Sequence, residues 1–223
     1  MPSKSSSKKT TRILVVDDHP LFRAGLAQFI SREPGLEVCG EAEDAKAALR
    51  LAGELKPDLV TLDLSLKDTR GTGLLKDLQS RYPTLPVLIV SMHDEALYAE
   101  RSLRAGAKGY LNKQQADATV VEAIQRILAG GVYVSDTVSN RVMSRMVGGG
   151  DPKGEPIDRL SDRELEVFQM IGSGLGTRQV AEQLHLSVKT IETYRANIMQ
   201  KLGLNGANEL VLHAVRWVQE NSG

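Results

Sequence analysis

Several features that would each indicate a particular class of protein are rare or missing in this sequence. It has one cysteine, Cys39, so it cannot form an internal disulfide, and a disulfide-stabilised secreted domain is excluded. Acidic and basic residues number 28 each, so the overall charge indicates neither a nucleic acid nor a membrane surface as partner. No apolar run approaches the roughly 20 residues that a transmembrane helix needs, and no apolar signal region follows the N-terminal lysines. We therefore expect a cytoplasmic protein without a membrane partner.

What the sequence does contain is a globular composition interrupted by one linker. Apolar residues make up 41% and charged residues 25% of the chain, which excludes a largely disordered protein. Residues 148–156, rich first in Gly and then in Pro, are typical of a linker between domains. We predict a disordered tail over residues 1–11, a first domain over 12–130, a linker with a helical segment over 131–157 and a second domain over 158–223.

Short apolar runs alternate with amphipathic segments throughout the first domain. Five runs rich in Val, Ile and Leu are typical of buried strands, and each is followed by apolar residues at helical spacing. The expected strands lie within residues 12–16, 36–40, 59–62, 86–91 and 108–113. This alternation predicts an α/β fold, a doubly wound five-stranded parallel sheet with helices on both faces.

Polar residues stand at the ends of four of these strands. Asp17 and Asp18 follow the first strand, Asp63 follows the third, and Ser91 and Lys113 end the fourth and fifth. Because the carboxyl ends of parallel strands share one edge, where open α/β sheets bind ligands, we expect these side chains to meet. Clustered acids repel one another unless a cation lies among them, and Mg²⁺ prefers carboxylate oxygens. A carboxylate can also attack phosphorus, so Asp63 is a candidate phosphoryl acceptor, with Ser91 and Lys113 placed to bind the phosphoryl oxygens.

His19 directly follows two of these acids and has two candidate roles. One is a metal ligand, and the other is a helix-entry residue whose side chain turns outward to solvent. Because Mg²⁺ takes oxygen ligands and imidazole suits other metals, we predict the outward orientation.

Four motifs of the first domain are similar to those of a known family. They are residues 16–20 (VDDHP), 58–63 (DLVTLD), 90–93 (VSMH) and 107–113 (AKGYLNK). Over about residues 12–130 the chain resembles the receiver domain of a two-component response regulator, which has a flavodoxin-like fold. The resemblance implies that a sensor histidine kinase transfers a phosphoryl group to Asp63.

The same resemblance implies the roles of the residues around the acceptor. It places Mg²⁺ on Asp18, Asp63 and the backbone carbonyl of Ser65, with Asp17 acting through water. It assigns phosphoryl binding and switching to Ser91, Tyr110 and Lys113. Ser65 and His93 stand where the family tunes the lifetime of the phosphoryl group. In one departure, Leu66-Lys67-Asp68 replaces the Met-Pro-Gly that often follows the phosphorylated Asp.

The second domain has the spacing of four short helices. Ser161 and Glu164 form the pattern of a capping box at the start of the first helix, and Ser187 is positioned to cap the third. The second and third helices are joined by a tight turn, which predicts a small all-α domain containing a helix-turn-helix. The outward side of the third helix carries Lys189, Thr190, Glu192, Thr193, Arg195, Ala196 and Asn197.

The charge of the second domain does not by itself indicate DNA. From Asp158 onward seven basic residues stand against eight acidic ones, and only residues 187–201 are locally positive. On these grounds a generic helical bundle is the alternative to a DNA-binding domain.

Four further motifs, residues 160–167, 174–181, 187–194 and 201–204, resemble the LuxR-type helix-turn-helix. Together with the receiver they give the NarL/FixJ layout and imply a homodimer on double-stranded DNA. The expected DNA contacts are Thr177, Arg178, Lys189, Thr190, Glu192, Thr193, Arg195 and Asn197. The expected dimerisation residues, which could equally form the core of the monomer, are Leu210, Val211, Ala214 and Val215. Where the family often has Lys and His, this chain has Glu192 and Tyr194.

These observations lead to one predicted function and two alternatives. We predict a transcription regulator, not an enzyme, in which phosphorylation of Asp63 controls DNA binding by the second domain. A regulator that binds DNA independently of phosphorylation is the first alternative. A magnesium-dependent phosphotransferase is the second, but it would want an acid two residues after Asp63, where this chain has Ser65.

Overall fold

The computed structural model describes residues 10–66, 72–147 and 156–221. The chain divides into two compact units, Met1–Val142 and Met143–Gly223, and each is considered by itself. Most of the predicted tail, and Lys67 and Asp68 of the unusual motif, lie outside the described residues.

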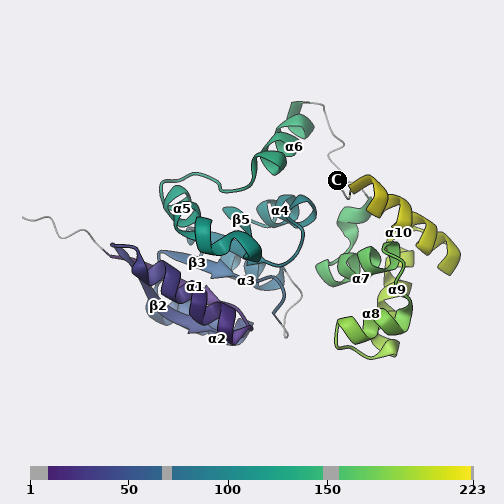
Figure 1. Ribbon diagram of the computed structural model, residues 1–223, viewed down its shortest axis with the longest axis horizontal. Coiled ribbons are helices and arrows are strands. Elements are labelled where there is room, and N and C mark those ends of the chain that lie inside the picture. The colour runs from purple at the N-terminus through teal and green to yellow at the C-terminus, as the bar shows by residue number, and fades with distance from the viewer. Residues whose placement is uncertain (1–9, 67–71, 148–155, 222–223) are drawn as a thin grey trace, which may run out of the picture. The chain divides into compact units, whose positions relative to one another are not determined.

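One parallel sheet organises the described part of the first unit (Figure 1). Its strands are β1 (Thr11–Val16), β2 (Leu36–Ala42), β3 (Leu59–Leu62), β4 (Val87–Ser91) and β5 (Gly109–Asn112). They lie in the order β2-β1-β3-β4-β5, and every pairing is parallel. This is the strand order of flavodoxin-like folds, and the predicted fold class is confirmed. Thr11, expected in the tail, is the first residue of β1.

Helices follow the strands in regular alternation. They are α1 (Pro20–Arg32), α2 (Ala45–Leu55), α3 (Gly73–Arg81), α4 (Glu95–Arg104) and α5 (Ala116–Leu128), with a 3-10 turn, η1 (Lys113–Gln115), before α5. Helices α1 and α5 lie side by side and share a core with Ile13, Val15 and Val90 of the strands. All residues of β3 and β4 are buried, which explains their uninterrupted apolar runs.

At two helix starts the cap is the residue just before an acid or a threonine. Helix α6 (Asp136–Val147) is capped by Ser135, whose Oγ accepts a hydrogen bond from the Val138 N–H at 3.3 Å, so Asp136 is its first residue and not its cap. Helix α8 (Thr177–Gln183) has Gly176 at the cap position, so Thr177 is also one residue inside its helix.

The described part of the second unit is entirely helical. Its elements are a 3-10 turn, η2 (Pro156–Arg159), and the helices α7 (Asp162–Gly172), α8, α9 (Val188–Leu202) and α10 (Ala207–Asn221). The predicted capping box is present at Ser161, and Gly203 ends α9 in a left-handed conformation with φ 69°. Helices α7 and α10 approach closely at Gly172, where an added Cβ would collide with the Ala214 carbonyl.

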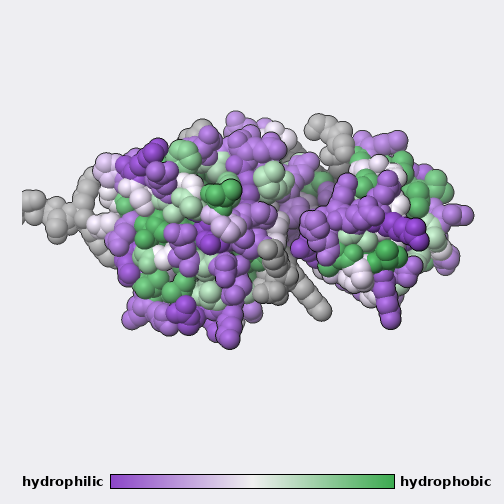
Figure 2. All heavy atoms as spheres, turned by 60° about the horizontal axis from the view of Figure 1, so that its bottom comes forward, coloured by the Kyte–Doolittle hydropathy of each residue, from purple (hydrophilic) through white to green (hydrophobic). Residues whose placement is uncertain are grey.

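Hydrophobic residues are mostly enclosed within each unit. In Figure 2 hydrophilic residues cover much of the visible surface of both units, with small hydrophobic groups between them. Among the described residues, no helix has both the length and the apolar character needed to span a membrane.

A buried carboxylate joins two helices of the second unit. Glu164 is 4% exposed, and its Oε2 accepts hydrogen bonds from the Ser161 N–H at 2.7 Å and from Lys201 Nζ at 2.6 Å. Burial alone raises the pKa of Glu164, but the hydrogen bonds from Lys201 and Ser161 outweigh burial and hold the pKa below its ordinary value. The ion pair therefore stabilises the fold above the ordinary pKa of Glu and is lost as the pH falls through the lowered pKa.

We expect Glu164→Gln to lower the free energy of unfolding of the second unit by about 1–3 kcal/mol at neutral pH. The loss should shrink as the pH falls through the lowered pKa, because Glu164 then becomes neutral in the wild type as well. Urea unfolding can be followed by the fluorescence of Trp217, the single tryptophan, whose ring packs edge-on against Phe168 at 5.8 Å between centroids. Glu166→Gln is the matched control, since the Glu166 side chain is more exposed than that of Glu164 and its partner Arg163 is three residues away on the same helix. Equal losses in the two variants would contradict the prediction.

Candidate functional site

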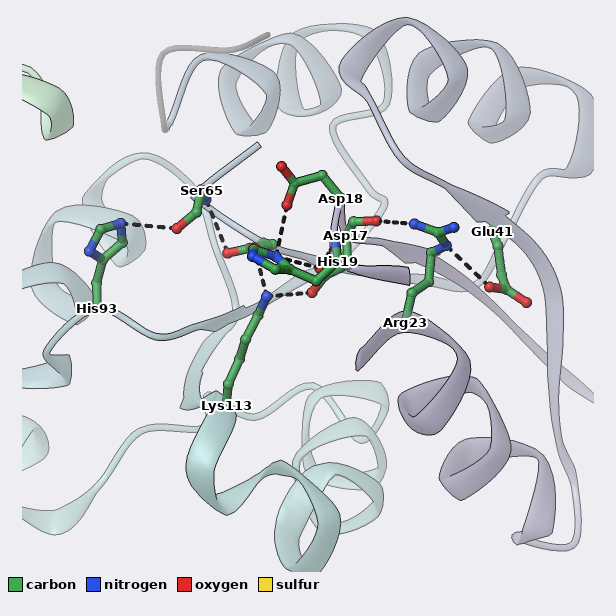
Figure 3. A network of polar contacts seen from close by, with 9 residues as sticks. Asp17, Asp18, His19, Arg23, Glu41, Ser65, His93 and Lys113 are labelled. Carbon is green, nitrogen blue, oxygen red and sulfur yellow. Dashed lines mark hydrogen bonds and ion pairs between the residues drawn. The ribbon is translucent and has the colours of Figure 1, made fainter. Parts of the chain in front are cut away.

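The carboxyl ends of the strands bring the predicted polar residues of the first unit to one edge of the sheet. Asp17 and Asp63 directly follow the adjacent strands β1 and β3, and the Asp63 N–H donates to the Val16 carbonyl at 2.9 Å. Lys113 enters from the end of β5. Figure 3 shows Lys113 reaching the acids from one side, with Ser65 on another side of the cluster.

Lys113 lies between two buried carboxylates. Its Nζ is 2.6 Å from Asp17 Oδ2 and 2.7 Å from Asp63 Oδ2, and none of the three residues is more than 8% exposed. Burial raises the pKa of Asp17, the hydrogen bond from Lys113 lowers it, and the charge of Asp63 raises it again, leaving the pKa above its ordinary value. The single positive charge of Lys113 therefore does not fully offset the negative charge of the carboxylates around it.

His19 is largely exposed, as the outward orientation predicts, but its Nδ1 also contacts this cluster. Its side chain is 62% exposed, yet Nδ1 lies 2.9 Å from Asp18 Oδ1, 3.3 Å from Asp17 Oδ1 and 3.8 Å from Asp63 Oδ2 (Figure 3). Ligand atoms of the four residues all lie within 4.8 Å of one another. The arrangement is suited to a divalent cation.

Two residues of α1 that carried no predicted site role support the cluster. Arg23 donates from Nη1 to the Asp17 carbonyl at 2.6 Å and pairs through Nε with Glu41 at 3.3 Å. The ring of Phe22 lies 4.6 Å from Lys113 Nζ, a cation–π contact that holds the ammonium over α1. The apolar spacing of α1 indicated a core position for Phe22 but gave no signal for this contact.

A second group of contacts surrounds His93, which follows β4. Its N–H donates to Ser91 Oγ at 3.3 Å, its Nε2 is hydrogen-bonded to Ser65 Oγ at 3.2 Å, and its ring stacks on Tyr98 at 4.5 Å. Tyr110 is 1% exposed and donates from its hydroxyl to the His93 carbonyl at 3.0 Å. Burial raises the pKa of Tyr110, so the phenol stays a donor. Ser91 and Tyr110, the predicted switch residues, thus meet at one backbone segment.

The chain beyond α5 is hydrogen-bonded to this region. Tyr133 accepts at its carbonyl from the Tyr110 N–H at 2.8 Å and donates to the Lys108 carbonyl at 3.1 Å. Two residues on, the Ser135 N–H donates to Glu95 of α4 at 2.8 Å. We call Tyr133–Ser135 the clasp segment. Its pairing joins residues more than 20 positions apart, so no local pattern indicated it.

In the second unit the predicted DNA contacts are spread over α8 and α9. Arg178, Lys189, Glu192 and Thr193 are exposed, and Thr177, Thr190, Arg195 and Asn197 are half-buried. Two hydroxyls have partners within α9 or its cap: Thr190 Oγ1 contacts Ser187 Oγ at 2.8 Å, and Thr193 donates to the Lys189 carbonyl at 3.0 Å. The exposed charges of α9 are therefore its most available groups for a nucleic acid.

The predicted dimerisation residues divide into two sets. Leu210 and Ala214 are fully buried in the core of the unit, which is the alternative role that the sequence left open for them. Val215 is half-buried, and Val211 is 40% exposed beside Leu212, which is 70% exposed. Helical periodicity marked α10 as apolar, but only its packing against α7 decides which side faces inward.

Comparisons with known proteins agree for both units. Residues 13–125 match the response regulator receiver domain, and residues 158–214 match the bacterial regulatory proteins of the luxR family. The response regulator GacA of Pseudomonas viridiflava is 35% identical over 205 residues, covering 92% of this chain and 95% of the relative. The transcriptional regulatory protein DegU of Brevibacillus brevis is 30% identical over 224 residues, covering 93% and 95%.

A solved structure is similar over most of the chain. RcsB from Salmonella enterica serovar Typhimurium, bound to a promoter in the presence of the phosphomimetic BeF3-, is 25% identical with a TM-score of 0.57, over 92% of this chain and 99% of that chain. The protein therefore belongs to the two-component response regulators. Its pairing of a receiver with a LuxR-type helix-turn-helix makes it a DNA-binding transcription regulator of the NarL/FixJ type, and the predictions of family and function class are confirmed.

We expect Asp63→Asn to raise the free energy of unfolding of the first unit by about 1 kcal/mol in the absence of divalent cations, because it removes one of three mutually repelling carboxylates. The amide retains the acceptor for the Ser65 N–H, which donates to Asp63 Oδ1 at 3.0 Å. Hydrogen exchange of peptides from β1 and β3 in the full chain with a chelator measures the change. Glu54→Gln removes the same charge at an exposed position, where Glu54 pairs with Arg50, and should leave exchange unchanged. Faster exchange in Asp63→Asn would overturn the prediction.

Proposed function

We propose that Asp63 accepts a phosphoryl group from a sensor histidine kinase and that this modification controls DNA binding by the second unit. The observation that carries the proposal is the position of Asp63, 2.7 Å from Lys113 Nζ and beside two further acids. In the reaction a carboxylate oxygen of Asp63 attacks phosphorus, and the bond between phosphorus and the nitrogen of the kinase phosphohistidine breaks. Lys113 offers its positive charge to the phosphoryl oxygens as they arrive.

The acidic residues suit the Mg²⁺ that this transfer needs. Asp18 and Asp63 would hold the ion with the Ser65 carbonyl, and Asp17 would act through water. Two observations support the fit: one lysine faces three acids, and Asp18 Oδ1 is buried without a hydrogen bond in the described part of the chain. When bound, the ion offsets the repulsion between Asp63 and the incoming phosphoryl oxygens.

The contacts around His93 offer a route from the acceptor to the rest of the chain. A phosphoryl group on Asp63 would draw Ser91 and Lys113 toward its oxygens, and Tyr110 would fill the space that Ser91 leaves. The Tyr110 N–H is hydrogen-bonded to Tyr133 of the clasp segment, and Ser135 of the same segment is hydrogen-bonded to Glu95 of α4. A shift of Tyr110 would therefore move the clasp segment, which contacts α4 and precedes α6. A local change of charge thus biases a packed, two-state region.

The second unit completes the proposal as the DNA-binding output. Residues 12–130 form the receiver, 131–157 the linker and 158–223 the DNA-binding domain, and the protein acts in the cytoplasm. Helix α9 enters the major groove, with Lys189 and Arg195 on phosphates or guanine edges. The exposed side of α10, around Val211, pairs two copies on a two-fold DNA site.

We expect a small phosphodonor such as acetyl phosphate to add one phosphoryl group to the wild type and none to Asp63→Asn, measured by intact mass. DNA affinity, measured in parallel, should change on donor addition only in the wild type. Glu54→Gln, which removes an exposed acid of the same unit, should behave like the wild type. Absence of a donor response in the wild type would rule out the proposed mechanism.

Phosphate contacts by α9 predict a steep dependence of DNA binding on salt. Lys189→Met and Arg195→Met should each reduce the slope of log affinity against log salt by about 1, because each removes one neutralised phosphate. Lys46→Met, an exposed lysine of the first unit, provides a control with the same loss of charge. Slopes equal to that of the control would argue against these contacts.

A further inference from the structure

We propose that Glu192 determines the base specificity of α9: its carboxylate accepts a hydrogen bond from the N4 amino group of one cytosine in each half of the DNA site. This inference rests on the DNA binding of the proposed function and names the base that the helix selects. It gives a purpose to an acid on a surface that has to approach a polyanion.

Glu192 lies on the outward side of α9. Ile191 and Ile198 are fully buried and fix the inner side of the helix. Glu192, Thr193 and Ala196 are exposed, and they form one patch because positions three and four apart are neighbours on a helix. The small side chain of Ala196 allows this part of α9 to approach the floor of a groove closely. A carboxylate one turn before it can therefore reach base edges.

The carboxylate of Glu192 is not used inside the protein. Lys189 and Arg195 stand three residues before and after it, which is a spacing at which ion pairs form along a helix. Such a pair does form in α7, where Arg163 lies 2.6 Å from Glu166. In the described part of the chain, however, Glu192 has neither an ion pair nor a hydrogen bond. Its oxygens are therefore available to a donor on another molecule.

The chemistry of a carboxylate selects cytosine among the four bases. An ionised carboxylate accepts hydrogen bonds and cannot donate them. In the major groove guanine and thymine present acceptors, which repel it, whereas cytosine presents the N4 amino donor. Adenine presents an amino group beside the N7 acceptor, a pair that suits the amide of Gln or Asn better than a carboxylate. Because phosphates repel Glu192, a cytosine contact is the arrangement in which this acid favours binding.

The neighbouring threonines do not compete for this contact. Thr193 donates its hydroxyl proton to the Lys189 carbonyl at 3.0 Å, so what it offers a base is its methyl group. The Thr190 hydroxyl is in contact with Ser187 Oγ at 2.8 Å. A methyl group suits the C5 methyl of thymine and accepts no hydrogen bond. Between Lys189 and Thr193, the carboxylate of Glu192 is therefore the acceptor that remains available to a base.

Selection of bound sequences from random double-stranded DNA tests the proposal. The full chain, treated with acetyl phosphate, is compared as wild type, Glu192→Gln, Glu192→Lys and Glu220→Gln. Glu220→Gln removes an exposed acid from the end of α10 and is the matched control. We expect one base of each half-site to change from cytosine in the wild type and the control to adenine in Glu192→Gln and to guanine in Glu192→Lys. The other selected positions should be retained.

Affinities measured at one salt concentration give the size of the effect. The wild type should prefer the selected site over the same site with adenine in place of cytosine by about 10-fold, and Glu192→Gln should abolish or reverse this preference. The control should keep the preference of the wild type.

The outcomes separate this inference from the function on which it rests. Identical selected sequences for the wild type and both Glu192 variants would overturn the inference and leave the proposed DNA binding intact. An affinity that rises in Glu192→Gln by the same factor for every sequence would also overturn it, because the carboxylate would then act on phosphates alone. A wild type that selects no sequence would overturn both this inference and the proposed DNA-binding output.

Discussion

The first unit depends on one buried charge contact, the ammonium of Lys113 between Asp17 and Asp63. Buried carboxylates are unfavourable unless they are paired, and this lysine is the partner that allows β1 and β3 to end in acids beneath the surface. The compensation is incomplete, because Asp18 faces the same space. The excess of negative charge at this point of the folded state favours the binding of a cation. A bound cation in turn favours the approach of an anionic phosphoryl group.

Strand β5 connects this site to the remainder of the chain. Lys113 directly follows this strand, Tyr110 lies within it, and its outer edge is paired with the clasp segment. Gly109 permits the pairing, since a Cβ there would meet the Tyr133 carbonyl. The strand that leads to Lys113 is therefore also the strand that pairs with the clasp segment before α6. A displacement at the acceptor site can reach the start of α6 through this pairing.

The near-neutral net charge of the second unit does not show which of its charged groups are paired internally and which are exposed. Lys201 is committed to Glu164 inside the unit, and Arg163 is paired with Glu166 along α7. The first pair joins α9 to α7, the second lies along α7, and together they neutralise two bases and two acids of the unit. The exposed bases Arg178 and Lys189 then stand on the helix-turn-helix itself. The net charge of the whole domain counts internally paired groups together with surface groups, but only the surface groups can contact a nucleic acid.

The sequence by itself determined the five strands, their polar ends and the capping box at Ser161, because these features follow from local periodicity and from the shared edge of parallel strands. The cluster of Asp17, Asp63 and Lys113 followed from the same reasoning. Only the tertiary structure decided that His19 turns toward the acids, that Leu210 and Ala214 belong to the core, and that the clasp segment pairs with β5. Each of these contacts involves residues that are distant in the chain. The residue spacing within one segment does not predict which distant partner an imidazole, an apolar helix face or the edge of a strand will contact.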